Sequence, residues 1–156
     1  MNFNDLQLFE YALSFFSEIS KVRYKMIVEY NGKLLTGKFL PDDKTFPTVH
    51  KYEKNFKRDS TWINFSSKEY GVIQLRRKIV DTFVNGNSDD VPVPDSLDLI
   101  NAINSLIPDI PSDAEVVNDF HIATDVEFLE TNLSFDFYRF PDDSQFNVVS
   151  LQPIDK

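Results

Sequence analysis

Few side chains in this 156-residue chain could carry out acid-base or metal chemistry. The sequence holds two histidines, His50 and His121, no cysteine, and 25 Asp and Glu residues. Without cysteine, disulfides, thiolate metal sites and cysteine nucleophiles are excluded. The four glycines form neither GxGxxG nor GxxxxGK[ST], and no GxSxG elbow marks a nucleophilic serine. We therefore expect a non-catalytic protein without a cofactor.

His121 supports one alternative, a metal site. In a strand it would share a face with Asp119 and Asp125, but residues two apart on a strand are about 6.8 Å apart, so one strand cannot chelate an ion. Further carboxylates would have to come from neighbouring segments, and the candidates are Asp136, Asp142 and Asp143. A divalent-metal-dependent hydrolase or nuclease with its centre near His121 is therefore one alternative function.

The stretch 119–151 has the clearest structural pattern. Apolar residues alternate with polar ones in three runs, which is the period of half-buried strands. The runs are Phe120, Ile122, Val126 and Phe128, then Leu133, Phe135 and Phe137, then Phe146 and Val148. Turn-prone residues separate them at 130–132 and 141–144. This pattern predicts a C-terminal three-stranded meander.

The opposite row of these strands is acidic and is our predicted binding face. It contains His121 and Ser134 among carboxylates, and Tyr138 would supply an aromatic anchor for a partner. The predicted binding residues are Asp119, Asp125, Glu127, Asp136 and Tyr138, with Asp142 and Asp143 at the rim. A face of this charge predicts a basic protein partner.

Charge is divided unevenly along the chain. Residues 1–85 hold 14 Lys and Arg against 10 Asp and Glu, whereas residues 86–156 hold 2 against 15. A secondary basic patch is predicted on a helix at 48–58, formed by His50, Lys51, Lys54, Lys57 and Arg58. It could contact an acidic partner or phosphate, or neutralise the acidic half internally. We predict that the two surfaces lie on opposite sides, with nucleic acid bound, if at all, through 50–58.

Periodicity, turn and cap signals predict the other elements. We expect helices at 4–21, 66–85 and 95–107, a hairpin of 24–30 and 33–40 around Asn31-Gly32, and a strand at 61–65. At 66–85 the alternation of Ile73, Leu75 and Ile79 also allows a strand in place of the helix. The length fits a single domain over residues 1–156, with a hinge or flexible loop at 86–94. The predicted fold is α+β, an antiparallel sheet built from hairpins and the meander, with two or three helices packed on one face.

These features favour a non-catalytic binding module acting through its acidic sheet face, such as an inhibitor, an immunity or antidote protein, or an adaptor. A small, acidic helix-and-hairpin chain rich in Asn, Asp, Lys, Phe and Ile is similar in style to many bacterial immunity proteins and phage-encoded inhibitors. No apolar run reaches the roughly 20 residues of a membrane span, and we expect a cytoplasmic protein. A third alternative is a phage or cell structural component that self-associates through the apolar side of its first helix.

Overall fold

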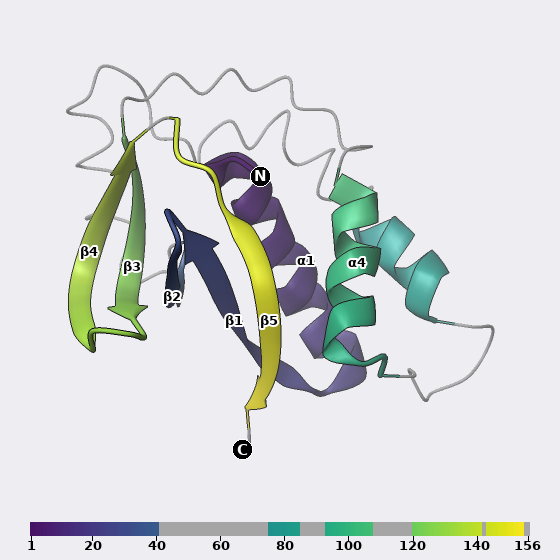
Figure 1. Cartoon of the computed structure of the whole chain (residues 1–156). Helices are drawn as coiled ribbons and strands as arrows, with labels where there is room; N and C mark the ends of the chain where they lie inside the picture. The colour runs from purple at the N-terminus through teal and green to yellow at the C-terminus, as the bar shows by residue number, and fades with distance from the viewer. Residues whose placement is uncertain (41–74, 85–92, 108–119, 142, 155–156) are drawn as a thin grey trace.

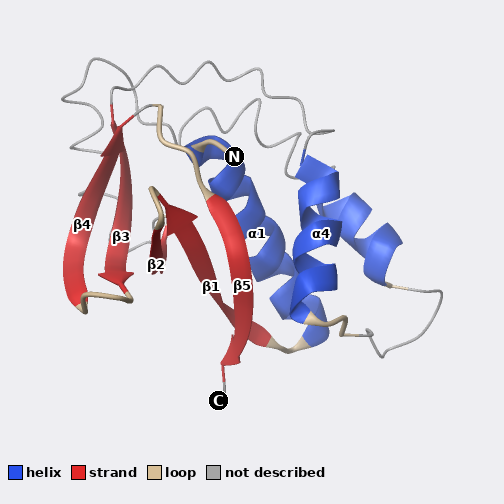
Figure 2. Ribbon diagram, viewed as in Figure 1, coloured by secondary structure: helices blue, strands red, loops and turns tan. Residues whose placement is uncertain are grey.

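The computed structural model describes residues 1–40, 75–84, 93–107, 120–141 and 143–154. The elements are α1 (Phe3–Ser20), β1 (Arg23–Tyr30), β2 (Lys33–Lys38), a helix over 75–83, α4 (Ser96–Leu106), β3 (Phe120–Phe128), β4 (Leu133–Pro141) and β5 (Asn147–Ile154). Within the described chain these are three helices and one five-stranded antiparallel sheet. Figure 1 and Figure 2 show the helices gathered on one side of the strands. The predicted α+β fold is confirmed.

Helix α1 forms where its apolar residues recur with helical spacing. The helix begins at Phe3, one residue before the predicted start, and Asn2 is the N-cap, whose Oδ1 accepts the Asp5 N–H at 2.8 Å. The helix ends where Lys21 adopts a φ of 63°. Leu6, Phe9 and Phe16 are completely buried. The apolar side of α1 is therefore part of the core and is not available for the self-association considered above.

The hairpin signal and the helix signals correspond to real elements. Asn31 and Gly32 have φ values of 50° and 75°, as the predicted type I′ turn requires. The Asp95 carboxylate caps α4 by accepting the Asp98 N–H at 2.9 Å. The predicted helix at 66–85 is helical over its described part, 75–83. The helix predicted at 48–58, the strand at 61–65 and most of the hinge at 86–94 lie outside the described residues.

The predicted C-terminal meander is wrong in its last strand. The strand order is β4-β3-β2-β1-β5, so β5 lies beside β1 at the far side of the sheet instead of beside β4 (Figure 1). There Val148 and Leu151 enter the core, and Ser96 Oγ at the start of α4 accepts the Leu151 N–H at 2.9 Å. The long-range pairing with β1 and packing against α4 outweigh the short connection from β4.

Aromatic side chains fill the core where β5 begins. The Phe146 ring is stacked on Tyr30 with centroids 5.3 Å apart and meets Phe140 edge-on at 5.0 Å. Phe3 of α1 and Phe39, just after β2, also contact Phe146, at 6.0 and 6.2 Å. One ring thus joins the helix layer to three parts of the sheet.

We predict that Phe146→Ala lowers the free energy of unfolding by about 3–5 kcal/mol, because it leaves a cavity among these rings. The measurement is urea denaturation followed by circular dichroism. Val149→Ala is the matched control on β5, since Val149 is 44% exposed and its truncation should cost no more than about 0.5 kcal/mol. Equal effects of the two substitutions would contradict the placement of β5.

Candidate functional site

A β-bulge in β3 determines which side chains face the helices. Thr36 is paired with Glu127 but Lys38 with Thr124, so β3 has one extra residue in this interval. Asp125 lies there with a φ of 51°. Before the bulge Ala123 packs in the core, and after it Val126 and Phe128 do so. The alternation predicted for β3 is therefore interrupted, because an odd residue reverses the faces of the strand.

His121 lies on the helix side of this bulge. Its side chain is 3% exposed, and its ring is stacked on Phe3 with centroids 4.8 Å apart and planes 13° from parallel. The predicted outward row that placed His121 with Asp125 and Glu127 is wrong for His121, which is a core residue. Among the described residues no three His, Cys, Asp or Glu side chains gather as a metal site would need.

Tyr138 also differs from its predicted orientation. It is half-buried, packs against the core cluster, and contacts the rings of Phe128, Phe135 and Phe140 at 5.4, 5.4 and 4.7 Å. Burial and the neighbouring Tyr30 raise the pKa of its phenol. Conversely, Phe135 and Phe137, predicted to be buried, are each 38% exposed. Tyr138 is therefore a sheet-packing residue and does not stand in an outer row with Asp136.

Three of the predicted acidic residues lie on the adjacent strands β3 and β4. Asp125 and Asp136 are both exposed and fall in the interval between the pairs Thr124–Phe137 and Val126–Phe135. Glu127 follows two residues along β3 and is half-buried. Lys38 Nζ lies 3.6 Å from Asp125 Oδ2, and both side chains are more than half exposed. We call Asp125, Glu127 and Asp136 the acidic triad.

The other predicted site residues are not part of this triad. Asp143 is exposed in the connection from β4 to β5. Asp119 and Asp142 lie outside the described residues, and so does the whole basic patch of His50, Lys51, Lys54, Lys57 and Arg58. The prediction that the acidic and basic surfaces lie on opposite sides therefore stays a prediction.

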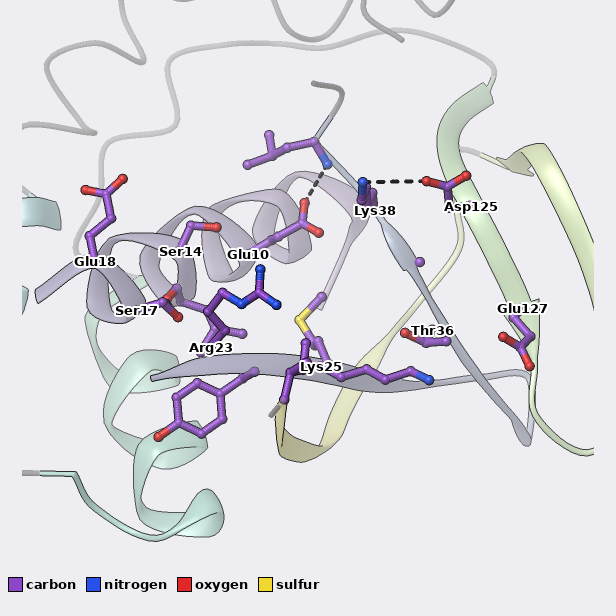
Figure 3. Close-up of a pocket in the computed structure, with 16 residues that line it drawn as sticks. Glu10, Ser14, Ser17, Glu18, Arg23, Lys25, Thr36, Lys38, Asp125 and Glu127 are labelled. Atoms are coloured by element: carbon purple, nitrogen blue, oxygen red, sulfur yellow. Dashed lines mark hydrogen bonds and ion pairs between the residues drawn. The ribbon is translucent and has the colours of Figure 1, made fainter. Parts of the chain in front are cut away.

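A cleft of about 820 Å³ opens beside the triad, between the diverging arms of the first hairpin. β1 and β2 are paired only at Val28–Leu35, Glu29–Leu34 and Tyr30–Lys33. Figure 3 shows the two strands separating from the turn, with α1 across the opening. Charged and hydroxyl side chains line it: Glu10, Ser14, Ser17, Glu18, Arg23, Lys25, Thr36, Lys38, Asp125 and Glu127. The volume is within the usual range of ligand sites, about 300–1,000 Å³.

Glu10 of α1 closes the cleft at the end of β2. Its carboxylate accepts the Phe39 N–H at 3.1 and 3.2 Å and the Leu40 N–H at 2.6 Å (Figure 3). Burial raises the pKa of Glu10 from 4.5 to about 7, although the two N–H groups and Lys38 favour its charged form. Such a carboxyl can hold or release a proton near neutral pH.

Sequence reasoning did not identify the cleft or Glu10. Glu10 falls on the polar side of the helix pattern, which predicts solvent contact, and the N–H groups that it accepts are about 30 positions away in the chain. The one early signal is the length of the hairpin arms, since long arms can diverge far from their turn. Only the pairing of β1 with β5 and of β2 with β3 shows that the arms diverge.

Comparison of the chain with protein-family models, with curated proteins and with solved structures found no match. The geometry described above therefore supplies the evidence for function.

The bulge gives a prediction about Asp125. Asp125→Val should lower the free energy of unfolding by about 1–3 kcal/mol, because a β-branched residue is strained at positive φ. Asp125→Asn should change it by less than about 0.5 kcal/mol, since Asn tolerates this conformation and an exposed ion pair contributes no more than about 1 kcal/mol. Chemical denaturation measures both. An equal decrease in the free energy of unfolding for Asn and for Val would show that the loss of the ion pair with Lys38 causes the effect.

Glu10 gives a prediction about pH. Its pKa in the folded protein exceeds the unfolded value, so folding takes up a proton between these two values and its contribution to stability falls as pH rises toward 7. From pH 5 to pH 8, wild type should therefore lose about 2–3 kcal/mol relative to Glu10→Gln. Glu18→Gln, an exposed change on the same helix, is the control. Parallel curves for wild type and Glu10→Gln would contradict the raised pKa.

Proposed function

We propose that this protein is a non-catalytic binding module whose acidic triad engages a basic surface on another protein. The observation that supports the proposal is that Asp125 and Asp136 are exposed on the adjacent strands β3 and β4, with Glu127 two residues further along β3. Like charges close together on adjacent strands repel one another. Apart from the exposed Lys38–Asp125 pair, the fold gains little from these carboxylates, whereas a basic surface on a partner would relieve their repulsion.

Electrostatic complementarity explains what such a triad would do. Clustered carboxylates speed the encounter with a basic surface and reject acidic competitors, more than they add affinity. In the described part of the chain the ion pair at the triad is Lys38–Asp125, and its exposed geometry leaves it open to exchange with a partner's cation. Asp143 would lie at the rim of the contact.

The proposed biological role is that of an inhibitor, an immunity or antidote protein, or an adaptor, acting in the cytoplasm. What supports a binding role over catalysis is the chemistry of the described residues. His121 is buried against Phe3, and no metal-ligating cluster of three side chains is found among the described residues, which supports binding over the metal-dependent alternative. None of the described helices has the length and apolar character needed to cross a membrane.

The test compares two charge-neutralised variants. The site variant is Asp125→Asn with Glu127→Gln and Asp136→Asn, and the control is Glu29→Gln with Asp81→Asn and Asp98→Asn, which changes net charge equally at exposed positions elsewhere. A partner is isolated by crosslinking to immobilised wild-type protein, and its association is timed at 50 and 300 mM NaCl. The site variant should associate about tenfold more slowly at low salt, with a flatter salt dependence. Equal rates for the two variants would contradict the proposal.

A further inference from the structure

Away from the turn, the two arms of the first hairpin are paired with the flanking strands β5 and β3 and not with each other. Below Val28, β1 continues through Arg23–Ile27 and is paired with β5. Above Leu35, β2 continues through Thr36 and Lys38 and is paired with β3. The inner edges of both arms face the cleft between them (Figure 3). The opening thus lies inside the sheet, between two strands.

Backbone alternation identifies the groups that face this opening. In an antiparallel ladder, alternate residues direct N–H and C=O to the same neighbouring strand. Tyr30 closes the two-residue turn with Lys33 and Val28 is paired with Leu35, so Met26 and Tyr24 also direct their groups toward β2. Pro153 of β5 lies opposite Tyr24 and has no N–H. This agrees with the assignment, because Tyr24 directs its backbone groups away from β5.

The irregularity in the β1–β5 ladder does not change which residues of β1 direct their backbone groups toward β2. Ile27 is paired with Ser150 and Val28 with Val148, so Val149 of β5 is the extra residue. On β2, Gly37 is two residues beyond Leu35. Like Lys33 and Leu35, it therefore directs its backbone groups toward β1, and here they face the opening. A Cβ on Gly37 would lie 3.1 Å from Val126 Cγ2, so glycine here lets β2 lie close against β3. Both inner edges therefore present backbone hydrogen-bonding groups.

We propose that the cleft receives an extended segment of a partner protein, which adds as a strand between β1 and β2. Two strand edges would bond such a segment at once, whereas addition at an ordinary sheet edge uses one. Five extended residues span about 17 Å, the length of the arm Arg23–Ile27, which is paired with β5 on its outer edge and with no strand on its inner edge. The segment would convert the divided sheet into a continuous six-stranded one.

The lining defines the chemistry of this segment. Leu13 and Ser14 of α1 and the buried Met26 form the inner side, which suits small or apolar side chains at alternate positions. Arg23 and Lys25 lie on the β1 wall, and Thr36 and Lys38 lie on the β2 wall, with Glu127 of β3 beyond them (Figure 3). An acidic side chain on the β1 side of the segment would therefore meet opposite charges.

This inference does not rest on the proposed function, although Asp125 and Glu127 line both surfaces. The experiments below change neither of those residues. Failure of the acidic triad to bind a partner and failure of the cleft to take a strand are therefore distinguishable, because the cleft is tested by exchange of β1 and β2 amides in protein with both carboxylates intact.

The first experiment is amide hydrogen exchange by NMR on the unbound protein. The Tyr24 and Met26 amides should exchange at least about tenfold faster than those of Lys25 and Ile27, which are bonded to β5. Equal protection of all four amides would overturn the proposal, because it would mean that the inner edge of β1 already has a partner.

The second experiment uses phage-displayed random ten-residue peptides selected on the full-length protein. A synthesised peptide from the selection should slow exchange of the Tyr24, Met26 and Gly37 amides by about tenfold or more. Ser14→Trp should abolish its binding, because Ser14 is an exposed residue of the cleft floor and an indole would occupy the space of the strand. Ser105→Trp, at an exposed position of α4, should leave binding unchanged.

Each outcome of the selection is decisive. Strand addition is supported if the peptide protects those amides in wild type and in Ser105→Trp but not in Ser14→Trp. Absence of any enriched peptide, binding that Ser14→Trp does not affect, or protection confined to other strands would overturn it. Thermal unfolding of both tryptophan variants establishes that they are folded.

Discussion

The pairing of β5 with the outer edge of β1 is the constraint on which the site depends. It holds the first arm of the hairpin against β5 and α4, while β3 holds the second arm. The hairpin can stay closed only near its turn, where Asn31 and Gly32 impose their backbone geometry. The cleft is the geometric result, and α1 covers its inner side because Leu6, Phe9 and Phe16 bury against the same sheet.

The second constraint is the single extra residue at Asp125. Because β3 has one extra residue, His121 and Ala123 before the bulge are buried in the core, and so are Val126 and Phe128 after it. It also brings the Asp125 carboxylate to 3.6 Å from Lys38 Nζ. A local backbone feature thus sets both the composition of the core and the charge of the surface.

Glu10 links these two features electrostatically. It lies between α1 and the end of β2, and Lys38 acts on it and on Asp125. Desolvation outweighs the favourable hydrogen bonds, so the carboxyl is poised near neutral pH.

The sequence by itself determined the elements whose signals are local. The apolar spacing of α1, the Asn31-Gly32 turn and the Asp95 cap act over a few residues, so each is visible in a short window. The α+β class follows from their order. The acidic residues of β3 and β4 were also recognisable as a group, because neighbouring strands of a hairpin keep them close.

Only the tertiary structure decided the position of β5, the bulge at Asp125, the inward turn of His121 and Tyr138, and the raised pKa of Glu10. These depend on contacts between residues far apart in the chain, such as Phe3 with His121 and Glu10 with Leu40. Strand order reflects the total packing free energy of the sheet against its helices, and a pattern with period 2 contains no information about it. A polar residue on a helix likewise appears solvated until the partner that buries it is known.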